Sequence, residues 1–252
     1  MIKSAIETVV AGRDLTEREA VAAMTDIMEG HATPAQIAAF IVGLRMKGET
    51  VAEITGCARV MRDKSVFIQT PEGCTPVDTA GTGGDGKHTF NISTTAAFVA
   101  AGAEVVMAKH GNRAASSQCG SADLLESLEI DISLSPAGVE AAIGEVGIGF
   151  LFAPTLHGAM RHAVGPRREI GVRTIFNILG PLTNPARSRH QLVGIYDGAL
   201  TAMMAEVLRN LGGERAFVVH GHDGIDEITT TGPTTISELR HGKVETYTVQ
   251  PE

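Results

Sequence analysis

The sequence predicts a small N-terminal helical domain followed by a larger α/β domain with a mostly parallel sheet. Two observations support this fold class. Helix-capping signals recur through residues 1–65, and beyond a linker rich in proline at residues 69–76 short apolar runs alternate with helical stretches. We therefore assign residues 1–70 to the helical domain and residues 71–252 to the α/β domain.

Four helices are expected in the helical domain. Apolar residues recur at i, i+3, i+4, i+7 and i+8 across residues 2–10, which is the pattern of a helix with one buried face. The next three helices each begin with a capping box, in which a threonine hydroxyl and a Glu or Gln side chain three residues later satisfy open backbone amides. The boxes are Thr16 with Glu19, Thr33 with Gln36 and Thr50 with Glu53.

Short runs rich in β-branched and apolar residues predict the strands of the α/β domain. They lie at residues 105–108, 149–152, 192–196 and 216–220, and a further short strand is expected to lead into the glycines after Asp78. Because helical stretches separate these runs, the strands are expected to be parallel. The segments TTISELR and KVETYTV flank His241 and Gly242 and predict an antiparallel hairpin.

Composition narrows the classes of function. A net charge of −8 and a scarcity of aromatic residues (Trp 0, Tyr 2, Phe 8) count against nucleic-acid binding, which relies on basic surfaces and stacking. Cys57, Cys74 and Cys119 are widely separated and form no C-x-x-C pair, so we expect free thiols in a reducing compartment. No apolar run approaches the length of a membrane span, and we expect a cytoplasmic protein without membrane association.

The stretch DTAGTGGDGKHTFNIST, from Asp78 to Thr94, holds two overlapping phosphate-binding motifs, and neither is complete. The GxGxxG motif of a dinucleotide site requires a helix that opens inside the glycines, but KHTFN intervenes. A P-loop requires Ser or Thr where His88 stands. Closely spaced glycines still favour backbone amides turned toward a phosphate, the alternative being a tight turn.

Polar residues around these glycines suggest further roles. Asp85 would repel a phosphate, so it is expected to contact a sugar hydroxyl or a metal ion. Asn91, Ser93 and Thr94 stand where a helix begins, and they either bind an anion or simply cap the helix.

A second loop, AKHGNRAASSQCGSAD, follows the strand near Val105. Its charged and hydroxyl side chains suit a second phosphate, although a solvated charged turn remains the alternative. The candidate phosphate ligands are Lys109, Arg113, Ser116 and Ser117, and the polar candidates for specificity are His110 and Asn112.

An acidic loop, HGHDGIDEITTT, brings Asp223, Asp226 and Glu227 together in sequence. Because Mg²⁺ is usually held by one or two carboxylates with substrate phosphate and water, this loop predicts a magnesium site. An exposed acidic turn is the alternative. His220 and His222 lack a third ligand at the spacing that zinc requires.

Arginines precede a Gly-Pro turn in GPRREIGVRTIFNILGPLTNPA. A guanidinium can bind a substrate carboxylate through two parallel hydrogen bonds. The alternative is that these arginines are ordinary charged residues on the surface of a helix. The local pattern leaves open which of Arg167, Arg168 and Arg173 points inward.

Taken together and in this order, the motifs resemble those of the anthranilate phosphoribosyltransferase family. They are GTGGD, NIST, KHGNRAASSQCGSAD, RTIFNILGPLTNP and DGIDE, and QIAAFIVGLRMKGET resembles the family's N-terminal helical region. The resemblance implies a fold of the nucleoside phosphorylase and phosphoribosyltransferase type, with a helical segment near residues 167–190 joining the helical domain. It also implies homodimers formed through the helical domain. Because members of the family continue past the hairpin, the α/β domain is expected to be incomplete at its C-terminus.

The resemblance implies transfer of the phosphoribosyl group of phosphoribosyl pyrophosphate to the amine of anthranilate in tryptophan biosynthesis, with two Mg²⁺ per subunit. The implied phosphoribosyl pyrophosphate ligands are Gly81, Gly84, Asp85, Thr89, Asn91, Ile92, Ser93, Thr94, Lys109, His110, Gly111, Asn112, Arg113, Ala114, Ala115, Ser116, Ser117 and Ser121. Gly81, Asn112 and Arg167 would contact anthranilate, near Pro181 and His110. Ser93 with Glu227 would hold one Mg²⁺, and Asp226 with Glu227 the second. No residue is assigned to proton transfer.

Two alternatives of the same fold remain open. A pyrimidine nucleoside phosphorylase would attack ribose C1 with phosphate and would need neither Mg²⁺ nor an arginine for a carboxylate. A non-catalytic nucleic-acid-binding relative is disfavoured by the charge of −8. A dinucleotide-dependent dehydrogenase is excluded because no helix opens at the glycines.

Overall fold

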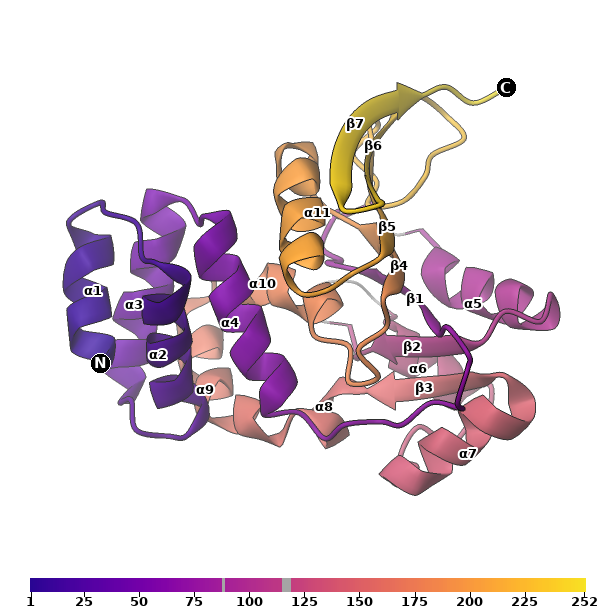
Figure 1. Ribbon diagram of the computed structural model, residues 1–252, viewed down its shortest axis with the longest axis horizontal. Coiled ribbons are helices and arrows are strands. Elements are labelled where there is room, and N and C mark those ends of the chain that lie inside the picture. Colours follow the sequence, from indigo (N-terminus) through magenta and orange to yellow (C-terminus); the bar gives the residue numbers. More distant parts are fainter. Residues whose placement is uncertain (88, 115–118) are drawn as a thin grey trace. The chain divides into compact units, whose positions relative to one another are not determined.

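The computed structural model describes residues 1–87, 89–114 and 119–252, which form two compact units (Figure 1). The helical unit comprises Met1–Ser65 and His157–Thr183, and the α/β unit comprises Val66–Leu156 and Asn184–Glu252. The sequence places this division slightly later, at residue 70. The residues in between belong to the α/β unit because the Val66 and Ile68 amides donate to the carbonyls of Leu156 and Pro185, at 2.9 Å and 3.2 Å.

The helical unit is built from the expected N-terminal helices and from the segment that returns to it later in the chain. Its elements are α1 (Ile2–Val10), α2 (Glu17–Met28), α3 (Pro34–Lys47), α4 (Val51–Asp63), η1 (Gly158–Met160), α9 (Arg161–Ile170), α10 (Phe176–Leu179) and η2 (Gly180–Leu182). All three predicted capping boxes are present, at the starts of α2, α3 and α4. The helix α9 packs against α2 and α3, and α10 against α4.

A fully buried carboxylate, Glu53, ties three parts of the helical unit together. It accepts hydrogen bonds from the Leu15 amide at 2.9 Å and from the Thr50 amide at 2.8 Å, and it pairs with the Lys47 ammonium at 3.0 Å. The residue that caps α4 therefore also fixes the end of α3 and the segment before α2. A buried carboxylate is stable only with such partners.

We expect His157 to make the helical unit sensitive to acid. Burial lowers the pKa of His157 to about 4 from 6.5, and a hydrogen bond with the Thr183 backbone only partly opposes this. The unfolded chain therefore binds more protons between these values, so this contribution to stability is present above pH 6.5 and is lost as pH falls toward 4. The whole shift of this pKa corresponds to at most roughly 3–4 kcal/mol.

Urea unfolding of the protein and of His157→Gln, above pH 6.5 and near pH 5, measures this contribution. The variant should lose less stability on acidification than the parent protein. His31→Gln is the control, since the side chain of His31 is 66% exposed in the same unit. Equal acid sensitivity of the parent and His157→Gln would refute this assignment.

The α/β unit contains, in its described residues, a seven-stranded sheet of order β3-β2-β1-β4-β5-β6-β7. Its strands are β1 (Val77–Gly81), β2 (Met107–Gly111), β3 (Ile148–Phe152), β4 (His190–Gly194), β5 (Arg215–Gly221), β6 (Thr234–Arg240) and β7 (Lys243–Val249). The first five in chain order are parallel, and β6 and β7 form the predicted antiparallel hairpin. His241 and Gly242 turn it with φ of 52° and 74°, the left-handed conformation of a tight hairpin.

One strand begins later than predicted. The sequence predicts a strand over residues 105–108, but β2 starts at Met107. The reason is the preceding turn, in which Glu104 has a φ of 66° and the Val105 amide still donates to the Ala100 carbonyl at 3.0 Å. The chain leaves this turn too late for Val105 to join the sheet.

Helices cover the sheet on both faces. They are α5 (Ile92–Gly102), α6 (Ser121–Ser127), α7 (Pro136–Val146), α8 (Ala153–Leu156) and α11 (Thr201–Asn210), with the short η3 (Gly198–Leu200). Side chains of β3 alternate between the faces, since Leu151 packs with Ile143 of α7 while Phe152 packs with Leu125 of α6. Within the described residues, no helix combines the length and the hydrophobicity that crossing a bilayer requires.

The strand order places a topological switch point between β1 and β4 (Figure 1). From β1 the chain proceeds through β2 to β3 on one side, and it returns to add β4 and β5 on the other. The residues Gly81 and Gly194 end these two strands and are register partners. Ligands of open α/β sheets bind beyond the carboxyl ends of the strands at such a point.

Candidate active site

Three loops meet at the switch point. The glycine loop follows β1, the second loop follows β2, and the acidic loop follows β5. The acidic loop reaches the glycine loop directly, because the Gly83 amide donates to Asp226 Oδ2 at 2.9 Å. The glycine loop and the acidic loop therefore lie together in the α/β unit.

Glycines permit this close approach. A Cβ atom at Gly194 would lie 1.7 Å from the carbonyl oxygen of Asp226, and one at Gly81 would lie 3.1 Å from Asp226 Oδ2. In the glycine loop, Gly83, Gly84 and Gly86 have φ of 62°, 80° and 72°, a region that other residues rarely adopt. The glycines thus shape the loop, and Gly194, which the sequence motifs do not single out, makes room for the acidic loop.

A buried lysine joins the first two strands. Lys109 Nζ donates to the Thr79 carbonyl at 2.5 Å and to Ser93 Oγ at 3.3 Å, and Thr79 Oγ1 donates to the Ser93 carbonyl at 2.9 Å. Burial lowers the pKa of Lys109 to about 8, and the charges of Asp78 and Glu227 oppose this shift. The predicted residues Lys109 and Ser93 therefore lie together, with Thr79 as a partner that the sequence did not reveal.

Three carboxylates, those of Asp85, Asp226 and Glu227, interact with one another, and Glu227 also interacts with this ammonium. Burial, followed by the charge of Asp85, raises the pKa of Asp226 to about 6. Burial, followed by the charge of Asp226, raises the pKa of Glu227 to about 7, while Lys109 and a hydrogen bond with the Ser93 backbone oppose the rise. The Oδ2 atom of Asp85 is buried without a hydrogen-bond partner. The carboxylates of this cluster repel one another when they are charged, and a bound cation would reduce that repulsion.

Asp223 does not belong to this cluster, although the sequence groups it with Asp226 and Glu227. Its Oδ2 accepts hydrogen bonds from the hydroxyls of Thr229 and Thr231, both at 2.6 Å, and these bonds lower its pKa to about 2. Asp223 therefore closes the acidic loop on itself.

Within residues 1–87, 89–114 and 119–252, no group of three or more His, Cys, Asp or Glu side chains is arranged to hold a metal ion.

The first turn of α5 faces the second loop. Asn91 precedes the helix but makes no capping hydrogen bond, and its side-chain amide instead donates to the Cys119 carbonyl at 3.2 Å. The alternative that Asn91 is a plain cap is therefore wrong. Ile92 begins the helix, and Thr94 is buried with an unpartnered hydroxyl.

In the second loop, side-chain oxygens accept hydrogen bonds from backbone amides of the described residues. The His110 amide donates to Asp78 Oδ1 at 3.0 Å, and Asn112 Oδ1 accepts from the Arg113 amide at 2.7 Å. Gly111 ends β2 and Ser121 begins α6. The predicted ligands Ala115, Ser116 and Ser117 lie outside the described residues, as does His88.

Arg167 lies on α9 in the helical unit. Its guanidinium lies 5.0 Å from the centre of the Phe176 ring, and burial lowers its pKa. Pro181 lies in η2 of the same unit and is buried.

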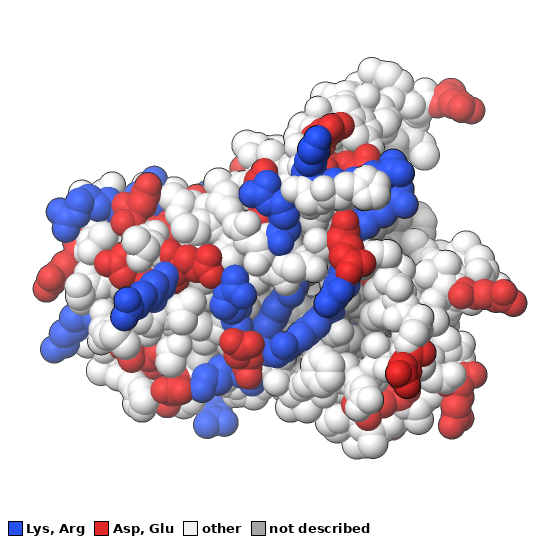
Figure 2. Space-filling view, viewed as in Figure 1, with Lys and Arg blue, Asp and Glu red and all other residues white. Residues whose placement is uncertain are grey.

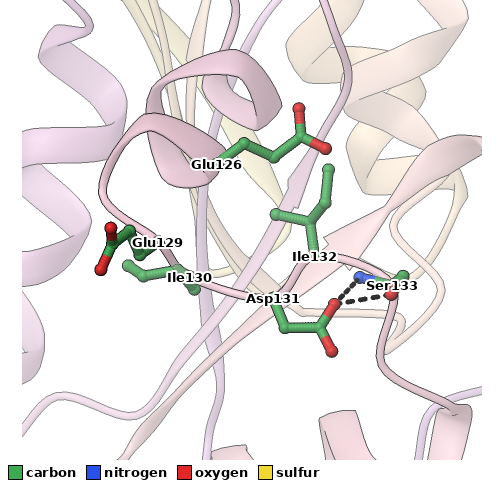
Figure 3. A pocket seen from close by; sticks show the side chains of 6 residues that line it. All are labelled: Glu126, Glu129, Ile130, Asp131, Ile132 and Ser133. Carbon is green, nitrogen blue, oxygen red and sulfur yellow. Dashed lines mark hydrogen bonds between the residues drawn. The ribbon is translucent and has the colours of Figure 1, made fainter.

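A hollow at the end of α6 is not a second candidate site. It is lined by Glu126, Glu129, Ile130, Asp131, Ile132 and Ser133. Their carboxylates point in different directions, and Asp131 is bonded to Ser133 (Figure 3). A ligand site requires convergent polar groups, which this hollow lacks.

Acidic and basic side chains are interspersed over the part of the surface that belongs to α1 to α4 (Figure 2). Such a mixed surface differs from the continuous basic face that phosphate-backbone binding uses.

Sequence comparison finds two domain families in this chain. Residues 3–65 match the helical bundle domain of a glycosyl transferase family, and residues 74–252 match its a/b domain. The anthranilate phosphoribosyltransferase of Symbiobacterium thermophilum is 60% identical over 251 residues, which cover 100% of this chain and 73% of that protein. That of Moorella thermoacetica is also 60% identical, with 100% and 74% covered.

Comparison with solved structures agrees with these sequence matches. The anthranilate phosphoribosyltransferase of Thermus thermophilus superposes with a TM-score of 0.91 at 44% identity, covering 98% of this chain and 73% of that one. The Saccharomyces cerevisiae enzyme in complex with phosphoribosyl pyrophosphate and Mg has a TM-score of 0.88 at 27% identity, covering 99% and 72%. The same yeast enzyme is also known in complex with 4-fluoroanthranilate.

Proposed function

Because the chain belongs to the anthranilate phosphoribosyltransferase family, we infer that it transfers the phosphoribosyl group of phosphoribosyl pyrophosphate to anthranilate in tryptophan biosynthesis. The amine nitrogen of anthranilate bonds to ribose C1 while the bond from C1 to the pyrophosphate oxygen breaks. Pyrophosphate leaves with the electron pair, and the nitrogen loses one proton. The observation that carries this proposal is the meeting of the glycine and acidic loops at the switch point, beside Lys109 and Ser93.

In this proposal the glycine loop and the second loop hold the two phosphate ends of phosphoribosyl pyrophosphate. Positive φ at the glycines and the open start of α5 support an anion there. The proposed ligands are Gly81, Gly84, Asp85, Thr89, Asn91, Ile92, Ser93, Thr94, Lys109, His110, Gly111, Asn112, Ala114 and Ser121, together with Ala115, Ser116 and Ser117.

The residues present suit Mg²⁺, and we propose two ions per subunit. Ser93 and Glu227 would hold one, and Asp226 and Glu227 the other. A cation there would relieve the repulsion that accompanies the raised pKa values of both carboxylates and the unpartnered Asp85 oxygen. When bound, Mg²⁺ neutralises charge on the pyrophosphate. So few protein ligands suffice because substrate phosphates and water complete the coordination.

Catalysis is then electrostatic and positional. Lys109, fixed by Thr79 and Ser93, places a buried positive charge beside the acidic loop. An aromatic amine is uncharged near neutral pH, so its nitrogen attacks without a strong base. The site therefore needs no paired base and nucleophile.

An assay tests the proposed function directly. The protein is mixed with anthranilate, phosphoribosyl pyrophosphate and Mg²⁺, and we expect the fluorescence of anthranilate to fall. A parallel mixture with a pyrimidine nucleoside and phosphate tests for phosphorolysis, which we expect to be absent. The reverse pattern would replace the proposal with a nucleoside phosphorylase.

We propose that Arg167 binds the carboxylate of anthranilate. Arg167→Ala should raise the KM for anthranilate roughly 10- to 100-fold, since a hydrogen bond to a charged group contributes about 1.5–3 kcal/mol. Aniline, which lacks the carboxylate, should react equally with the parent protein and the variant. Arg168→Ala is the matched control, because Arg168 is the next residue on α9 and is exposed. An unchanged KM in Arg167→Ala would remove this role.

We further propose a homodimer that forms through the helical unit in a reducing cytoplasm. Val10 and Met46 of this unit are largely exposed, and burial in a dimer would remove them from water. All three cysteines are free thiols.

A further inference from the structure

Asp123, in the first turn of α6, joins the two ends of the second loop. Its Oδ2 atom accepts hydrogen bonds from the Ala114 amide at 3.0 Å and from the Gly120 amide at 2.8 Å. These ends lie so close that a Cβ atom at Gly120 would be 2.4 Å from the Ala114 nitrogen. One carboxylate oxygen therefore fixes both sides of the loop neck.

Two further side chains hold Asp123 in place. Arg113 pairs with Asp123 Oδ1 at 3.1 Å, and its guanidinium also binds the Glu126 carboxylate, with one contact at 2.7 Å. The same guanidinium lies 5.6 Å from the centre of the Phe152 ring on β3. We call Arg113, Asp123 and Glu126 the neck clamp. The backbone hydrogen bonds, and then Arg113, lower the pKa of Asp123, so it is charged at neutral pH.

The neck clamp acts on the backbone directly after β2. The Ala122 amide, beside Asp123, donates to the Asn112 carbonyl at 3.2 Å, so the start of α6 is fastened to the end of the strand. This strand carries Lys109 toward Ser93. The sheet holds Lys109 to Gly111, and the clamp fixes the chain that follows them, from Asn112 to Ala114.

We propose that Asp123 is a positioning residue for phosphoribosyl pyrophosphate and that Arg113 acts through Asp123 rather than as a phosphate ligand. This rests on the proposed function of the site. The guanidinium of Arg113 already uses both of its terminal nitrogens to bind two carboxylates, so turning these nitrogens to a phosphate would compete with the two ion pairs. The neck clamp instead uses that charge to orient the carboxylate that holds the loop.

Three variants separate the parts of the clamp. Asp123→Ala removes the shared acceptor and should weaken phosphoribosyl pyrophosphate binding by roughly 10- to 100-fold, with a matching rise in its KM. Asp123→Asn keeps an oxygen for the two amides and should restore most of the affinity. Arg113→Ala should weaken binding less than Asp123→Ala, and in the Asp123→Ala background it should have no further effect.

Binding is measured by calorimetry with phosphoribosyl pyrophosphate and Mg²⁺, and melting temperatures establish that each variant is folded. Hydrogen exchange at the Ala114 and Gly120 amides supplies a readout that does not depend on activity, and it should accelerate in Asp123→Ala. Asp131→Ala is the matched control, because Asp131 also accepts a backbone amide, that of Ser133 at 2.8 Å, just after α6 (Figure 3).

The outcomes are distinct. If the parent protein binds phosphoribosyl pyrophosphate and Asp123→Ala binds it equally well, the positioning role is wrong. If Arg113→Ala weakens binding by the same factor with and without Asp123, Arg113 is itself a ligand and the proposal fails. If the parent protein shows neither binding nor turnover, the proposed function fails, while the exchange data still report on the clamp.

Discussion

Replacement of Asp226 by asparagine together with Glu227 by glutamine should lower kcat by about 10³-fold or more at ordinary Mg²⁺ concentrations, because electrostatic stabilisation of the leaving group is lost. The fold should survive. Both carboxylates are partly buried and have raised pKa values, so their charged forms destabilise the folded protein at neutral pH. The neutral amides remove that repulsion, and the melting temperature in the absence of Mg²⁺ should rise.

Steady-state kinetics, calorimetric titration of Mg²⁺ and thermal unfolding test this prediction together. The matched control is Asp131→Asn with Glu129→Gln, which removes two carboxylates from the hollow after α6. This control should leave kcat and Mg²⁺ binding unchanged. Near-normal turnover in the Asp226 and Glu227 double variant would refute the assignment of these residues as Mg²⁺ ligands. A fall in melting temperature would show that repulsion between the two carboxylates does not destabilise the protein.

A single methyl group at Gly194 should be nearly as damaging. Its Cβ atom would lie 1.7 Å from the Asp226 carbonyl oxygen, so the acidic loop must move away. Displacing an active-site group by about 1 Å lowers the rate on the order of 10²-fold. Inserting an extra methyl group into a well-packed region lowers the free energy of unfolding by about 1–3 kcal/mol. We therefore expect Gly194→Ala to lose both activity and stability.

Gly232→Ala is the control for this prediction. Gly232 lies in the same loop, its φ is not positive, and a Cβ atom there would meet no atom within 4 Å. Steady-state kinetics and urea unfolding of both variants measure the changes in kcat and in the free energy of unfolding. Normal kcat in Gly194→Ala would mean that the acidic loop is free to shift without consequence, which contradicts the proposed site.

Local signals predicted the helical unit well. A capping box is complete within four residues, so Thr16, Thr33 and Thr50 could be identified as helix starts without knowledge of the fold. The parallel sheet was likewise predicted from the alternation of strands and helices. The segment from His157 to Thr183 was placed only approximately, since its membership of the helical unit depends on packing against distant helices.

The candidate site was predicted in part. Its loops carry recognisable residues, but the contacts among them depend on strand order, which no local pattern contains. Gly194 matters only because β4 lies beside β1, and Thr79 only because Lys109 reaches it from the next strand. Asp223 was grouped with Asp226 because the two are close in sequence, whereas threonine hydroxyls six and eight residues away bind its carboxylate.

The discontinuous helical unit has a consequence for synthesis of the chain. When Ser65 leaves the ribosome, the four N-terminal helices exist without α9 and α10, which complete their packing. The apolar surfaces of α2, α3 and α4 that pack against α9 and α10 therefore stay exposed to water until the chain has been synthesised as far as Thr183. We therefore expect an isolated fragment of residues 1–65 to be prone to aggregation, and a fusion of that fragment to residues 157–183 to be the shortest version of the bundle that folds by itself.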